Sequence, residues 1–373
     1  MTFAEFSHSL PSGTKKDSLL RGLLMAALLG VLLWELSAAR AFIVPVCLSA
    51  LLAFLMNPLV RFFCRHRVPH WLSITLSASL LALLLISMLT FLVYETRALI
   101  IGLPSIVSGL NGKLVLLSKS PLFHRLHLPG TMSEVLERVT SGTGHGMPAL
   151  LNGVEGIVKT GSVLVIVLMF SVVMLATREH LRRSAERILT RAENIRGPQI
   201  LDQVIALIEK FLYARLIIIA VIAAASVLVL RLFGLSYSFV LGPFIGIMTL
   251  LPEIGFVISL IPVVIVAFAT AHSLLSTVLL VGVLFVVHTL EGYLLTPKLL
   301  GKRLDINALA TFLGVFAGGL LWGVAGMFLS VLILGVLRII MSAVPSLEGW
   351  GELLAQPERK GKRVFFEKTK AAA

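Results

Sequence analysis

The fold of this chain is decided by residues 254–290, which read IGFVISLIPVVIVAFATAHSLLSTVLLVGVLFVVHTL and include no Asp, Glu, Lys or Arg. As one helix the run would measure about 55 Å, whereas the hydrocarbon core of a bilayer is about 30 Å thick. Gly255 and Pro262 mark places where a helix can break. The sequence therefore predicts that this run folds back or crosses a membrane more than once.

The rest of the chain has the same apolar character. Hydrophobic residues make up 57% of the 373 residues and charged residues only 14%, against about 45–50% and 25% in soluble domains. This composition excludes a soluble enzyme, a disordered protein and a collagen-like fibre. It predicts an all-α polytopic membrane protein with about eight membrane segments, some of them broken or re-entrant hairpins. The other runs that reach spanning length are 19–37, 41–60, 68–94, 160–177, 211–230, 232–252 and 306–337. The last of these, at about 48 Å as one helix, is also too long for a single crossing and is expected to fold back.

The basic residues predict an orientation. Most of the 32 Lys and Arg residues lie near the N-terminus and within 61–67, 178–215, 298–303 and 359–370. Because cytoplasmic loops carry the excess of Lys and Arg, all five clusters and both termini are expected in the cytoplasm. Pro104 and Gly112 are expected to interrupt the segment after the third crossing. The predicted regions are 1–94 with three membrane helices, an extracytoplasmic amphipathic segment at 95–159, 160–231 with two membrane helices and a basic interfacial helix at 178–210, a hairpin-rich transport region at 232–340, and a basic tail at 341–373.

Several kinds of chemistry lack their motifs. The two cysteines give neither a disulfide framework nor a metal-binding spacing, and the sequence contains no GxxxxGK[ST] loop and no HExxH pair. We therefore expect no enzyme activity, no cofactor, no metal and no ATP-driven pumping. Aromatic side chains do not alternate with the arginines, which favours membrane lipids over nucleic acid as the partner of the basic clusters.

A first candidate site surrounds Glu253, the only charged residue between Arg231 and Glu291. A charge within a membrane segment costs about 2.5–3.5 kcal/mol on insertion scales, so its presence requires a reason. Pro252 and Gly255 flank it, where the helix must break. Glu253 either forms the polar tip of a hairpin turn or places a carboxylate at a broken helix end, where transporters bind substrates and cations.

A second candidate site begins with His288 and Glu291, which are three residues apart and so share one face of a helix. This connector is either a positive cytoplasmic loop with a satisfied Lys–Asp pair, or an inner gate or coupling-ion site. Glycines at GxxxG-type spacing follow and favour either close helix packing or a pliable gate. The connector's further polar candidates are Thr296, Lys298, Asp305 and Asn307, and the glycines are Gly314, Gly318 and Gly323.

Over about 205–340 the sequence resembles the autoinducer-2 exporter family of bacterial inner-membrane proteins. The resemblance lies in FGLSY at 233–237, LPEIG at 251–255, IP at 261–262 and EGYLLTPKLLGK at 291–302. It implies transport of a quorum-sensing furanosyl compound, and some relatives are described as sodium(lithium)/proton antiporters. It also implies a homo-oligomer, with a pentamer as the expected assembly. Glu253 departs from the aromatic or neutral residue of many members.

These features predict a transporter that exports a small polar solute or signal such as autoinducer-2 and is not driven by ATP. A sodium(lithium)/proton antiporter is the alternative, with a cation as the partner. A membrane scaffold or partner of an envelope enzyme is a second alternative, and it would need no polar path through the membrane.

Overall fold

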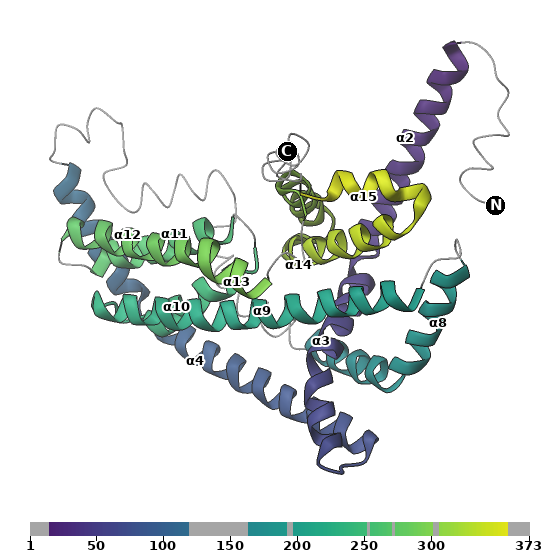
Figure 1. Cartoon of the computed structure of the whole chain (residues 1–373). Coiled ribbons are helices and arrows are strands. Elements are labelled where there is room, and N and C mark those ends of the chain that lie inside the picture. The colour runs from purple at the N-terminus through teal and green to yellow at the C-terminus, as the bar shows by residue number, and fades with distance from the viewer. Residues whose placement is uncertain are drawn as a thin grey trace, which may run out of the picture.

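The computed structural model describes residues 15–118, 163–191, 197–251, 254–270, 273–300 and 306–356, and within these ranges the chain is helical with no strand (Figure 1). This confirms the all-α membrane fold. The longer helices are α2 (Lys15–Ala38), α3 (Arg40–Arg65), α4 (His70–Ser118), an unlabelled helix at Val163–Ala176, α8 (Arg178–Arg191), α9 (Gly197–Leu232), α10 (Ser238–Met248), α11 (Gly255–Thr270), α12 (Leu274–Leu290) and α14 (Ala308–Ala343). The short ones are η1 (Glu291–Leu295), α13 (Thr296–Leu300), η3 (Pro345–Leu347) and α15 (Glu348–Leu354).

The described residues support about six membrane crossings, fewer than the eight segments expected. Five helices are long and apolar enough to cross by length and composition, with the folded-back α14 counted as one, and the number is six if the Val163–Ala176 helix and α8, which meet at a bend of 70°, form one span. The expected crossing at 232–252 is instead α10, which has 11 residues, and α11 has 16. Such helices are about 16 and 24 Å long, shorter than the bilayer core.

The long apolar run does break, as its length predicted. It divides into α11, which ends at Thr270, and α12, which begins at Leu274. The Ser273 hydroxyl caps α12 by accepting a hydrogen bond from the Ser276 amide at 3.2 Å. Pro262 lies within α11, so the break lies after that proline rather than at it.

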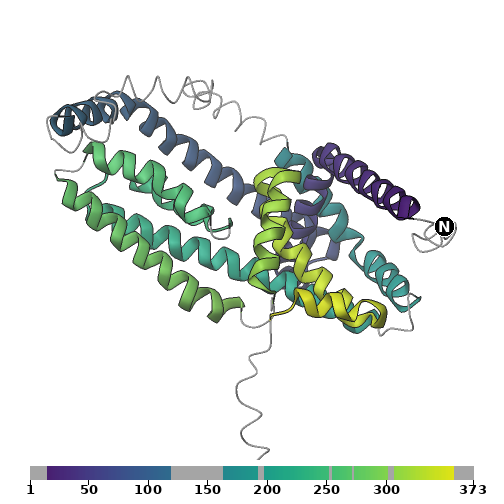
Figure 2. The ribbon, with the colours of Figure 1, turned by 90° about the horizontal axis from the view of Figure 1, so that it is seen from above.

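The run at 306–337 folds back on itself, also as expected. Within α14 the backbone leaves helical geometry at Trp322 and at Gly323, whose φ of 63° is a left-handed value that favours glycine. A Cβ at Gly318 would collide with the carbonyl of Gly326, so the two limbs pack backbone against backbone. Figure 2 shows α14 turning back along its own path. Close packing is therefore the role of Gly318, whereas Gly323 makes the turn.

Helix α4 continues where an interruption was expected, and runs through Pro104 and Gly112 to Ser118. Its outer half is held by tertiary packing, because Ile106 and Leu110 are buried in the same apolar cluster as residues of α9 to α12. This packing compensates for the hydrogen bond that proline removes from a helix.

Helix α9 is the central element, since its residues contribute to two of the three apolar clusters (Figure 1). It ends where the amide of Leu235 donates to the carbonyl of Leu230 at 3.0 Å, with Gly234 at a φ of 76° between them. This is the Schellman arrangement, which needs a residue that tolerates positive φ. The turn directs the chain back so that α10 packs along α9.

Candidate functional site

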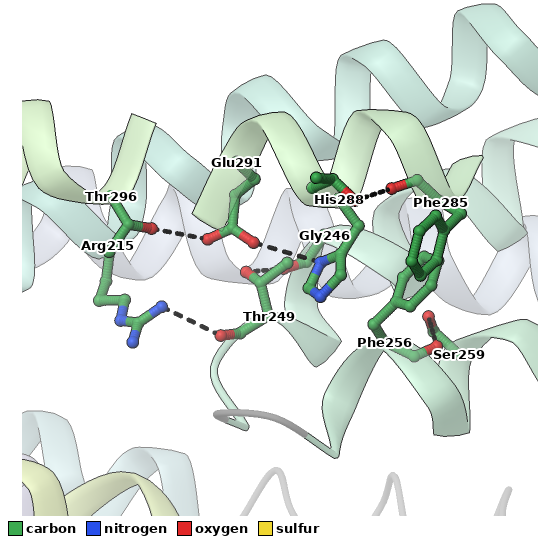
Figure 3. A network of polar contacts seen from close by, with 10 residues as sticks. Arg215, Gly246, Thr249, Phe256, Ser259, Phe285, His288, Glu291 and Thr296 are labelled. Carbon is green, nitrogen blue, oxygen red and sulfur yellow. Dashed lines mark hydrogen bonds and ion pairs between the residues drawn. The ribbon is translucent and has the colours of Figure 1, made fainter. Parts of the chain in front are cut away.

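A polar group inside the apolar bundle begins with Arg215, which lies in the apolar part of α9 (Figure 3). Its Nη1 donates to the carbonyl oxygen of Thr249 at 3.2 Å, and its guanidinium lies 5.4 Å from the centre of the Phe211 ring. Thr249 caps the end of α10. The buried Nε of Arg215 has no hydrogen-bond partner among the described residues. One donor of this arginine is therefore still available.

Glu291 lies opposite, at the junction of α12 with η1, and is only 6% exposed. Its Oε1 accepts a hydrogen bond from the Thr296 hydroxyl at 2.9 Å, and its Oε2 lies 3.3 Å from Nδ1 of His288. The five residues that start at Glu291 form a π-helix. Short π-helical turns are frequent at functional sites, because they reposition side chains that a regular helix would align.

His288 connects this carboxylate to a third helix. Its ring stacks on Phe256 of α11 with the ring centres 4.2 Å apart and the planes inclined by 3°. Figure 3 shows Arg215 and Glu291 reaching toward the same space from α9 and from the end of α12. We call this set, Arg215, Thr249, His288, Glu291 and Thr296, the Arg215–Glu291 cluster.

The two opposite charges of the cluster do not neutralise each other by contact. Arg215 and Glu291 attract each other electrostatically, yet no salt bridge within 4.0 Å joins them. Charges in a membrane segment are costly and usually serve a substrate or ion path. An arginine donor and a carboxylate acceptor that interact electrostatically without direct contact can bind one ligand that carries both oxygen acceptors and hydroxyl donors.

The structure brings together three of the site residues expected from the sequence, His288, Glu291 and Thr296. Lys298 is exposed and has no contact with the cluster in the described ranges. Asn307 caps α14, because its side-chain oxygen accepts from the Leu309 amide at 3.1 Å.

The remaining expected site residues lie in or beside turns. Gly255 lies against the carbonyl of Met248, where a side chain would not fit, so its place is explained by the close approach of α10 and α11. Pro252, Glu253 and Asp305 lie outside the described residues.

Sequence reasoning did not identify Arg215 or Thr249. Arg215 borders the uncharged run 216–230 and is the last residue of the basic cluster 178–215, so the charge pattern groups it with the residues expected in the cytoplasm. A signal was present, however, because the run reaches spanning length only if Phe211–Tyr213 are included, and this places Arg215 inside the span. Thr249 acts through its backbone carbonyl, which no side-chain pattern reveals.

A model of the AI-2E transporter family matches residues 23–346. The chain belongs to this family. Among similar proteins, a putative transport protein from Haemophilus influenzae is 25% identical over 91% of this chain and 97% of its own length. The putative transport protein YhhT from Escherichia coli is 28% identical over 86% and 89% of the two chains. The AI-2 transport protein TqsA from Escherichia coli is 23% identical over 86% and 92%.

The family match confirms the resemblance seen in the sequence and extends beyond residues 205–340 on both sides. It covers α3, α4 and the Val163–Ala176 helix as well as every member of the Arg215–Glu291 cluster. The cluster is therefore part of the AI-2E region of this membrane protein and does not lie in an added segment.

Proposed function

We propose that this AI-2E family member exports a small polar solute such as autoinducer-2 across the bacterial inner membrane without ATP, and that the Arg215–Glu291 cluster lies on the solute's path. The observation that supports this most is the half-buried Arg215, whose buried Nε has no hydrogen-bond partner among the described residues and whose charge is attracted by the Glu291 carboxylate. The name of one relative, the AI-2 transport protein TqsA, supports the choice of solute.

The cluster suits a solute rich in hydroxyl and carbonyl oxygens. The Arg215 Nε donates to an oxygen acceptor of the solute, and Glu291 accepts from a hydroxyl. Thr296 and His288 hold the carboxylate in place. Because each hydrogen bond to a charged group is worth about 1.5–3 kcal/mol, two such contacts recognise the solute without holding it too tightly for release.

The proposal is tested by efflux of autoinducer-2 from liposomes that contain the purified protein. Replacing the guanidinium in Arg215→Gln should lower the initial rate about tenfold or more, since one charged hydrogen bond is lost. The matched control is Arg231→Gln, at the exposed end of the same helix, which should stay within about twofold of the native rate. Equal rates for the two variants would remove the cluster from the path.

A second candidate function, sodium(lithium)/proton antiport, is favoured by the contact between His288 and Glu291. An imidazole beside a buried carboxylate is a pair that can take up and release a proton. Glu253 remains a second candidate carboxylate from the sequence alone. Antiport requires a sodium gradient to move protons in the same liposomes without any solute, as a trapped pH-sensitive dye would report. A scaffold would give neither signal.

We also propose a homo-oligomer, a pentamer by family resemblance, with both termini in the cytoplasm. Only 12–33% of the most apolar stretch of each of the five spanning helices is buried inside the chain. The large remainder is available to lipid and to neighbouring subunits. The mass of the detergent-solubilised complex measures the number of copies.

A further inference from the structure

A second feature lies apart from the Arg215–Glu291 cluster, where α3, the Val163–Ala176 helix, α8 and the start of α9 enclose a pocket of about 620 Å³. These four elements lie together in Figure 1, beside the labels α3 and α8. None of the five cluster residues lines the pocket. The ligand of this pocket is therefore considered separately from the transported solute.

One wall of the pocket is apolar. It is formed by the inner face of α3, by the end of the Val163–Ala176 helix and by the first turns of α9. The side chains of this wall are Ala50, Ala53, Phe54, Met174, Leu201 and Ile205. A surface of this kind fits a hydrocarbon chain and offers no partner to a free polar ion.

The rest of the lining carries an excess of positive charge. Four arginines and two glutamates line the pocket. Arg182 and Arg183 form salt bridges with acidic side chains at 2.7–3.2 Å. The other two arginines lack such a direct partner: Arg178 donates to the neutral side chain of Asn57 at 2.8 Å, and Arg61 has no hydrogen bond or ion pair within the ranges described.

The change from apolar to basic follows the backbone. Ala50 and Ala53 lie within α3, whereas Arg61 lies in its last turns. On the opposite side, the 70° bend between the Val163–Ala176 helix and α8 turns the chain where its apolar sequence gives way to arginines. A pocket with its apolar part along a spanning helix and its basic part at that helix's end matches a molecule at a membrane surface.

We propose that this pocket binds one anionic phospholipid, with an acyl chain along the α3 wall and the phosphate at Arg61 and Arg178. A phosphate supplies the acceptor oxygens that these two guanidinium groups lack as ionic partners. The acyl chain fills the apolar wall, which a soluble phosphate would leave empty. The basic end of the pocket lies on the side that the basic clusters predict to be cytoplasmic, and anionic lipids in the cytoplasmic leaflet attract Lys and Arg.

The test is native mass spectrometry of the full chain in detergent, titrated with phosphatidylglycerol. Arg61→Gln should weaken the first bound lipid about fivefold, the loss expected for one arginine near an anionic headgroup. Arg187→Gln removes the same charge from an exposed position on α8 that does not line the pocket, and it should bind like the native chain. Arg61 is exposed, so its replacement leaves the packing intact, and an unchanged melting temperature verifies this.

Two further ligands distinguish the source of the phosphate. Phosphatidylcholine with the same acyl chains should bind at least fivefold more weakly than phosphatidylglycerol, and glycerol phosphate, which has no acyl chain, should not bind measurably. Equal affinity for both lipids, or equal losses in Arg61→Gln and Arg187→Gln, would overturn the proposal. Binding of glycerol phosphate as tight as that of the lipid would show a simple anion site instead. None of these outcomes depends on transport.

Discussion

At the scale of single residues, the unusual property of this chain is a carboxylate and a guanidinium that lie near each other in a spanning region without forming a salt bridge. Arg215 uses one donor on a backbone carbonyl, and Glu291 uses one oxygen on a hydroxyl and the other on an imidazole. Because each charge is held by a neutral or titratable neighbour, neither needs the other for its position. A solute that enters between them can therefore exchange contacts with both.

The Thr296 hydroxyl is the contact whose removal tests this arrangement most narrowly. Thr296→Val keeps the shape of the side chain but removes the donor to Glu291 Oε1. A hydrogen bond to a charged group is worth about 1.5–3 kcal/mol, so solute efflux should fall about tenfold or more. Thr296→Ser retains the hydroxyl and should transport nearly as fast as the native chain. Equal losses in the two variants would show that the methyl group, and not the hydrogen bond, matters.

At the scale of elements, the glycines of α14 allow two helical limbs to touch. Gly318→Ala places a Cβ against the Gly326 carbonyl and the side chain of Ser330, and such overpacking costs about 1–3 kcal/mol. Gly282→Ala in α12 meets nothing within 4 Å, so it should raise stability by up to about 1 kcal/mol, as alanine does within helices. Thermal unfolding in detergent should therefore shift in opposite directions. A rise for both variants would contradict the hairpin.

Sequence predicted those elements whose cause is local. The break between α11 and α12 and the turn at Gly323 both follow from runs too long for one crossing. The length of α4 could not be predicted from the sequence, because packing of Ile106 and Leu110 on other helices keeps it helical beyond Pro104.

The site residues also fall into those that a local pattern predicts and those that depend on tertiary packing. His288 and Glu291 are three residues apart in the chain, whereas Arg215 comes near Glu291 only because α9 and α12 pack side by side (Figure 1).

At the scale of the whole molecule, the two hairpins decide how the ends of the chain are placed. Because α14 turns back at Trp322 and Gly323, we expect its end to lie on the side of the membrane where it began. Helices α10 and α11 are each shorter than the bilayer core, so together they are also expected to leave the sidedness unchanged. Sidedness then depends on the long helices, and the basic clusters at 178–215 and 359–370 are expected on the same face.

Cysteine labelling in intact cells tests this sidedness directly, after Cys47 and Cys64 are replaced by serine and efflux is shown to persist. Arg187→Cys in α8 and Glu348→Cys in α15 lie at exposed positions, and both should react with a membrane-impermeant maleimide only after the membrane is opened. Ser141→Cys lies in the region that the sequence places outside and should react at once. If positions 187 and 348 reacted on opposite faces, one of the two hairpins would have to cross the membrane completely, and the sidedness expected from α10, α11 and α14 would be wrong.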